Sequence, residues 1–156
     1  MSRVTFDVYG SAQPQGSKSL MPNGAMLEGG TDELRANRRN WRSAVADAAA
    51  DALADQLDGR QMDGPLSLDV VFRAPMPASR SKAIRAVGRW WKPTAPDLDK
   101  LVRSVGDSLT ASGLIKDDAR IVALRAVKLE VDGWTGARIC VREIDGGPGL
   151  LIEMVS

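Results

Sequence analysis

One stripe of apolar residues in the second half of the chain constrains the fold most. Its members recur at spacings of three and four residues, at Leu98, Leu101, Val102, Val105 and Leu109. This spacing places them on one face of an α-helix. Pro96 and Asp97 form a start signal for this helix, and Gly113 lies near its stop. A helix with one apolar face has to pack against another layer of the protein.

The other periodic segments predict a sheet and a second helix. Residues 3–9 alternate between apolar and polar types, and residues 66–72 form a short apolar run, so both are predicted strands. Residues 119–131 and 137–144 also alternate, and the turn Asp132-Gly133 between them predicts a β-hairpin.

A long helix is predicted for residues 32–57, with an apolar face formed by Trp41, Val45, Ala48 and Ala52. The resulting order β-α-β-α-β-β predicts an α/β (α+β) fold, in which a mixed sheet packs against two main helices. A length of 156 residues fits one domain spanning 1–156. Trp134 is predicted to join Trp41 in the core, and Cys140 to act as a small apolar strand residue.

Three segments lack a clear periodic pattern. Residues 10–31 are polar and rich in glycine, so we expect a mobile loop there. Residues 73–96 form a proline-flanked excursion with room for a short helix within 79–87. The tail 145–156 fits either a loose end or a last edge strand.

Composition places the chain among ordinary globular proteins, with 44% hydrophobic and 26% charged residues. A single cysteine excludes an intramolecular disulfide and favours a reducing compartment. Neither a signal peptide nor an apolar run long enough to span a membrane is apparent, so we expect a cytoplasmic protein without membrane contact.

Acidic residues gather around the apolar stripe, in a chain that has no histidine. Asp99, Arg103 and Asp107 follow one another at four-residue intervals on the helix face opposite the stripe. Asp97 and Asp99 point the same way only if Asp97 is still extended, at the N-cap. Helix capping, a solvated charge stripe and a turn at Asp117 and Asp118 are an alternative explanation for these residues.

Clustered carboxylates repel one another, so a cluster is stabilised only by a counter-charge. Oxygen ligands without histidine or paired cysteines suit Mg²⁺ or Mn²⁺ better than zinc or copper. An EF-hand is excluded, because the segment lacks the required glycine and the terminal glutamate. The sequence PTAP, rather than a buried strand, precedes Asp97, which argues against a nucleophilic phosphatase motif.

The segment PDLDKLVRSVGDSL, followed by GLIKDDARIVALRAVKLE, resembles the RusA family of bacterial and phage Holliday-junction resolvases. The shared features are Pro-Asp-x-Asp, an apolar-patterned helix with an inner Asp-x-Leu, a turn with glycine, an Asp-Asp pair and a strand that ends in lysine. The likeness is strong over residues 96–130 and faint in the first strand and in GSAQPQGSK.

The resemblance implies roles for individual residues. Asp97, Asp99 and Asp118 match the acidic residues that bind Mg²⁺ at the scissile phosphate, and Asp117 lies beside them. Where the family has a catalytic lysine, four residues after the second aspartate, this chain has Arg103. Arginine can hold a phosphate but cannot release a proton at neutral pH, and Lys100 is a second source of positive charge.

The resemblance also implies a function: an endonuclease, dependent on Mg²⁺ or Mn²⁺, that resolves four-way junctions or other branched DNA by paired symmetric nicks, in recombination and repair. Two symmetric nicks imply a homodimer. Because Arg103 departs from the family pattern, a catalytically inactive branched-DNA-binding protein is the alternative. A third hypothesis is a small phage protein whose acids bind a structural cation without any DNA role.

Basic residues and one tryptophan are the candidates for DNA contact, since cations neutralise phosphates and an indole stacks on an exposed base. Six of the basic residues and the tryptophan lie between residues 73 and 92, a stretch without an acid. The candidates are Lys18, Arg73, Arg80, Lys82, Arg85, Arg89, Trp90, Lys92 and Lys100. For Trp91, we also consider packing into the core or into a dimer interface.

Overall fold

The structure is a computed structural model that describes residues 2–147 of the chain. Its main elements are β1 (Arg3–Tyr9), α1 (Asp32–Leu57), β4 (Leu66–Pro75), α3 (Leu98–Ser112), β6 (Ile121–Val131) and β7 (Gly136–Glu143). The smaller ones are β2 (Lys18–Leu20), β3 (Met26–Glu28), α2 (Lys82–Val87), β5 (Arg89–Trp91) and the 3₁₀ turn η1 (Asp118–Arg120). The main elements follow the predicted order β-α-β-α-β-β, which confirms the fold class.

Five strands form a mixed sheet in the order β1-β7-β4-β6-β5. Strands β4 and β6 run parallel, and the other neighbouring pairs run antiparallel. The predicted hairpin of β6 and β7 is therefore wrong, because β4 lies between these two strands. Alternation identifies a strand but not its partner. The apolar β4, with four fully buried side chains, takes the central position between them.

The connection from β6 to β7 crosses the end of β4 and is held there by Arg73. The Nε of Arg73 donates to the carbonyl oxygen of Trp134 at 3.0 Å, and its guanidinium lies 4.2 Å from the centre of the Trp134 ring. Tyr9 packs edge-on against the same ring. Trp134 is thus half-buried at the end of the sheet, and the prediction that it lies in the core is wrong.

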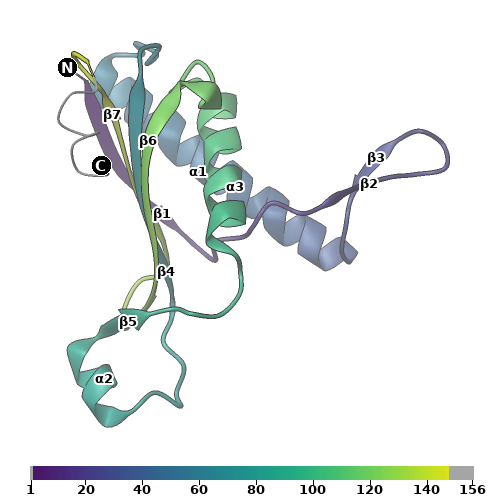
Figure 1. Cartoon of the computed structure of the whole chain (residues 1–156), viewed down its shortest axis with the longest axis vertical. Coiled ribbons are helices and arrows are strands. Elements are labelled where there is room, and N and C mark those ends of the chain that lie inside the picture. The colour runs from purple at the N-terminus through teal and green to yellow at the C-terminus, as the bar shows by residue number, and fades with distance from the viewer. Residues whose placement is uncertain (1, 148–156) are drawn as a thin grey trace.

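Both long helices pack on one face of the sheet (Figure 1). Helix α3 buries the predicted stripe residues Leu101, Val105 and Leu109. Helix α1 buries Trp41, as predicted, together with Val45, Ala49 and Ala52. Ala48, predicted for this face, is only half-buried, since α1 turns Ala49 rather than Ala48 toward the sheet. Cys140 is buried, as expected for a small strand residue.

Two segments project from this body (Figure 1). The first is the hairpin of β2 and β3, which forms within residues 10–31, the segment expected to be a mobile loop. Glu28 holds the base of this hairpin, because its carboxylate accepts from the Gly16 amide at 2.8 Å and from Arg42 on α1 at 3.3 Å. Although burial raises the pKa of Glu28, these hydrogen bonds and the charges of Arg42 and Arg38 lower it below its ordinary value.

The second projection comprises α2 and β5, within the predicted excursion 73–96. It is tied to β6 by Arg80, whose guanidinium donates two hydrogen bonds, of 2.6 and 2.9 Å, to the carboxylate of the buried Glu130. Among residues 2–147, no helix is long and apolar enough to span a membrane. Residues 148–156, which make up most of the tail 145–156, lie outside the described part of the chain.

Candidate active site

Helix α3 begins as the sequence predicts, with Asp97 as an extended N-cap residue (φ −66°, ψ 135°). Its carboxylate nevertheless makes no capping hydrogen bond within the described residues. Instead it lies 3.4 Å from the ammonium group of Lys100, and 65% of the side chain is exposed. The capping explanation for Asp97 is therefore wrong, and its carboxylate faces solvent.

The backbone just before Asp97 is fixed by Lys128 of β6. The Nζ of Lys128 donates to the carbonyl oxygens of Thr94 at 2.8 Å and of Pro96 at 2.7 Å. The carbonyl oxygen of Lys128 in turn accepts from the Lys92 amide at 3.1 Å. The sequence identified this lysine as the end of a strand, but gave no sign that it holds the segment leading to Asp97.

The turn after α3 brings Asp117 and Asp118 back against the helix. Asp117 caps η1, since its carboxylate accepts from the Ala119 amide at 2.8 Å. Asp118 lies over Gly106, where an added Cβ would be 3.6 Å from the Asp118 Cβ. This contact places Asp118 beside Asp107, in the middle of α3 rather than at its start.

The carboxyl group of Asp118 has a pKa above its ordinary value. Partial burial raises its pKa, and the neighbouring carboxylates of Asp117 and Asp107 raise it further. The repulsion among these acids is therefore not fully offset by the cations nearby. Such a group favours either a proton or another positive partner.

A hollow of about 520 Å³ opens beside Asp118 and combines acidic with basic groups. It is lined by Gln15, Gly16, Ser17, Lys18, Lys100, Arg103, Asp107 and Asp118. Four of these, Lys18, Lys100, Arg103 and Asp118, are candidates predicted from the sequence. Asp107 lies on the predicted charge stripe, but it was not among the predicted site residues.

Gln15 is a residue of this hollow that the sequence did not reveal. Its backbone amide donates to the carbonyl oxygen of Lys100 at 3.0 Å, which ties the loop after β1 to the first turn of α3. Its side-chain Oε1 is buried and accepts no hydrogen bond from residues 2–147. A buried acceptor of this kind needs a partner from outside the chain, such as water or a cation.

The structure does not bring all predicted metal ligands together. Within the described residues, no three His, Cys, Asp or Glu side chains are close enough to hold a metal ion. Asp99 and Asp107 are eight residues apart, which corresponds to about 12 Å along the axis of α3. Asp97 and Asp99 therefore stand at the start of the helix, and Asp118 stands about two turns further on.

The chemistry around Asp118 still fits a hard divalent cation. The available ligand atoms are oxygens, burial and the neighbouring carboxylates raise the pKa of Asp118, and the buried Oε1 of Gln15 accepts no hydrogen bond from the described part of the chain. Asp107 and Asp118 line the hollow, and Asp117 adjoins them.

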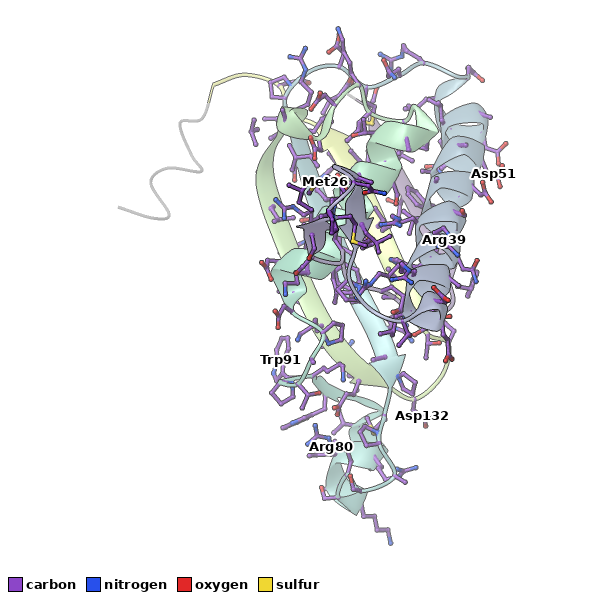
Figure 2. The ribbon with its side chains drawn as sticks, turned by 90° about the vertical axis from the view of Figure 1, so that its right-hand side faces the viewer. Met26, Arg39, Asp51, Arg80, Trp91 and Asp132 are labelled. Carbon is purple, nitrogen blue, oxygen red and sulfur yellow. The ribbon has the colours of Figure 1, made fainter. Side chains whose placement is uncertain are left out.

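The remaining DNA-binding candidates lie mainly on the second projection. Lys82, Arg85 and Arg89 are exposed there, as are Trp90 at 42% and Trp91 at 62%. The core alternative for Trp91 is therefore wrong. Figure 2 shows Trp91 and Arg80 in this lower part of the molecule. Arg80 differs from the others because Glu130 already occupies its guanidinium.

The chain matches the model of a known protein family. The family model described as endodeoxyribonuclease RusA matches residues 22–142, which include α1, α3, η1 and every candidate site residue except Lys18. The chain therefore belongs to the RusA family, a family of Holliday-junction-resolving endonucleases that act on branched DNA. None of the curated proteins with which the chain was compared matches it.

Proposed function

We propose that this protein is a Mg²⁺-dependent endonuclease that resolves Holliday junctions by paired symmetric nicks, in DNA recombination and repair. The observation that carries the proposal is the exposed side of α3. Asp97 and Asp99 stand at its start, Arg103 and Lys100 follow, and Asp118 is held against its middle. Family membership supplies the substrate class, branched DNA.

Acidic and basic residues have separate tasks in this proposal. The proposed ligands of Mg²⁺ or Mn²⁺ are Asp97 and Asp99 at the start of α3 and, about two turns further on, Asp118 with Asp117 beside it. In this arrangement one ion would contact one of the two groups. When bound, such an ion polarises the phosphodiester and lowers the pKa of a water molecule. Arg103 offsets charge on the phosphate and remains protonated throughout, so it orients and stabilises without transferring a proton.

Proton transfer at the site then falls to a carboxylate or to water, because the chain contains no histidine. Lys100, 3.4 Å from Asp97, holds positive charge near the same end of the helix.

The two projections supply the surface for DNA. Lys18 begins β2 on the first, and Lys82, Arg85 and Arg89 lie exposed on the second. Figure 1 shows the start of α3 between them. Phosphates bound at both projections would thus bracket the acidic residues, and Trp90 is available to stack on an exposed base.

A four-way junction has two strands to cut symmetrically. One chain has one such helix, so two copies related by a two-fold axis are the simplest arrangement that makes paired nicks. The proposal therefore includes a homodimer. Size-exclusion chromatography with light scattering, on the protein alone and with junction DNA, tests this part by itself.

Asp99→Asn is the substitution that tests the proposed activity. It keeps the size of the side chain and removes the charge, so we expect junction affinity to be retained and nicking to fall by about 100-fold or more. Asp51→Asn, at an exposed position of α1, is the matched control and should nick like wild type. Undiminished nicking by Asp99→Asn would exclude the proposed role of the acids.

The position of Arg103 supports one alternative, a branched-DNA-binding protein without catalysis. The family resemblance places a lysine there, and Arg103 cannot replace a lysine that releases a proton. Under the main proposal, Arg103→Lys nicks at a rate similar to wild type. Nicking that appears only in Arg103→Lys would favour the alternative.

A further inference from the structure

A second hollow, of about 470 Å³, adjoins the candidate active site and is not explained by the metal chemistry. It lies between the loop that follows β1, the end of β4 and the segment that leads from β5 to α3. Its apolar lining is formed by Pro14, Phe72, Pro75, Pro96 and Leu101. This volume lies within the range of pockets that bind small organic groups.

The charged groups of this pocket are cationic. Arg73, Lys92 and Lys128 line it, and within the described part of the chain the lining includes no acid. Lys128 uses two of its ammonium protons on Thr94 and Pro96, which leaves a third for a ligand. The pocket therefore suits a flat apolar group with hydrogen-bond acceptors, attached to an anion.

The pocket shares its wall with the start of α3. Pro96 lines it and is covalently joined to Asp97, while the amide of Leu101, another lining residue, donates to the carbonyl oxygen of Asp97 at 3.1 Å. A ligand in this pocket would therefore lie next to Asp97 and next to a phosphate bound at Asp97.

We propose that this pocket binds one unpaired nucleobase of the branched DNA, next to the phosphate that is cut. This inference rests on the proposed function and extends it to the recognition of a base. Pro14, Pro75 and Pro96 would contact the base faces, and the free proton of Lys128 would meet an acceptor on the base edge. Lys92 would hold the adjoining phosphate.

A branch point is the place in duplex DNA where such a base is available. Taking a base out of a stacked, paired helix costs a few kcal/mol, and the cost is smallest where pairing is already disturbed. A pocket of this kind therefore selects junctions over plain duplex. It also gives the enzyme a preference among bases at the cut site.

The test follows the base directly and needs no cleavage. The fluorescent base 2-aminopurine is placed, one position at a time, around the branch of a synthetic four-way junction, with EDTA present. At one position we expect wild type to raise the fluorescence several-fold on binding, because the base leaves its stack. Fluorescence anisotropy of a separate end label reports junction affinity in the same samples.

Two variants probe the pocket, and one serves as control. Ala74→Leu adds bulk to a lining residue and should remove the position-specific signal at protein concentrations at which the anisotropy shows the junction to be saturated. Ala54→Leu makes the same change at an exposed position of α1 and should keep the signal. If Ala74→Leu does not fold, as judged by thermal melting, Lys92→Met serves instead and should weaken the signal.

The outcomes separate this inference from the proposed function. Junction binding without any position-specific signal, or with a signal that the pocket variants leave intact, would overturn the pocket alone. An absence of junction binding by wild type would overturn the proposed function and the pocket with it. A signal that Ala74→Leu or Lys92→Met removes, and that Ala54→Leu keeps, supports the base pocket.

Discussion

The ammonium group of Lys128 donates a hydrogen bond to the carbonyl oxygen of Pro96 at 2.7 Å, which joins strand β6 to the residue just before Asp97. A second bond from the same group reaches Thr94 at 2.8 Å. The position of Asp97 thus depends on a lysine that lies 31 residues later in the sequence. Lys128 is a positioning residue in this account, because it acts on the acid through the backbone.

Lys128→Met keeps the length of the side chain and removes both hydrogen bonds. Hydrogen bonds to a charged group contribute about 1.5–3 kcal/mol each, less where solvent reaches them, so we expect a modest loss of stability. We also expect a higher Mg²⁺ concentration for half-maximal nicking, because Asp97 is no longer held. Lys128→Arg should restore part of this effect. A variant that loses stability, but keeps the Mg²⁺ dependence of wild type, would show that Lys128 is merely structural.

The ion pair between Arg80 and Glu130 predicts how the free energy of unfolding depends on pH. The two hydrogen bonds from Arg80 lower the pKa of Glu130, and they outweigh the opposing effect of burial. Glu130 therefore adds stability that is fully present above the ordinary pKa of a glutamate and is lost as the pH falls through its folded-state pKa. In Arg80→Met the buried carboxylate has lost this partner, and its pKa rises.

Arg80→Met should thus lower the free energy of unfolding most at neutral pH, and the difference from wild type should shrink in acid. Urea denaturation at several pH values measures this. Lys82→Met, at an exposed position nearby, serves as the control and should show little change. A constant difference across the pH range would mean that the ion pair does not account for the effect of Arg80.

The close contacts around Gly16 predict how firmly the hairpin of β2 and β3 is attached to α1. A Cβ at this position would collide with the guanidinium of Arg38 and with the Glu28 side chain, including its Cγ. Gly16→Ala should therefore displace Glu28 and loosen the hairpin from α1. Limited proteolysis should then cut within residues 17–28 faster than in wild type.

The control for this change is Gly64→Ala, since a Cβ at Gly64 would meet no atom within 4 Å. Proteolysis of the hairpin in this variant should match wild type. If Gly16→Ala is also cut at the wild-type rate, the contacts of Glu28 do not hold the hairpin in place.

Local sequence patterns predicted those features that depend on neighbouring residues. Helix α1 spans residues 32–57, as its periodicity indicates, and α3 begins after an extended Asp97 and ends at Gly113. Both depend on caps and on spacing within one segment. The features that sequence missed depend on contacts between distant segments.

The pairing of β6 shows this limit, because alternation marked it as a strand but the turn signal suggested the wrong neighbour. In the site, the aspartate motif predicted a cluster of Asp97, Asp99 and Asp118, whereas packing of Asp118 over Gly106 places it beside Asp107. Gln15 is held in the site by a backbone hydrogen bond to Lys100, which no pattern in the sequence predicts.

The most direct test of the account is a nicking assay on a synthetic four-way junction, against a linear duplex of matched sequence, with Mg²⁺ and with EDTA. We predict paired, symmetric nicks near the branch point that require Mg²⁺, and no cutting of the duplex. Junction binding without nicks under any metal condition, or equal cutting of junction and duplex, would contradict the account.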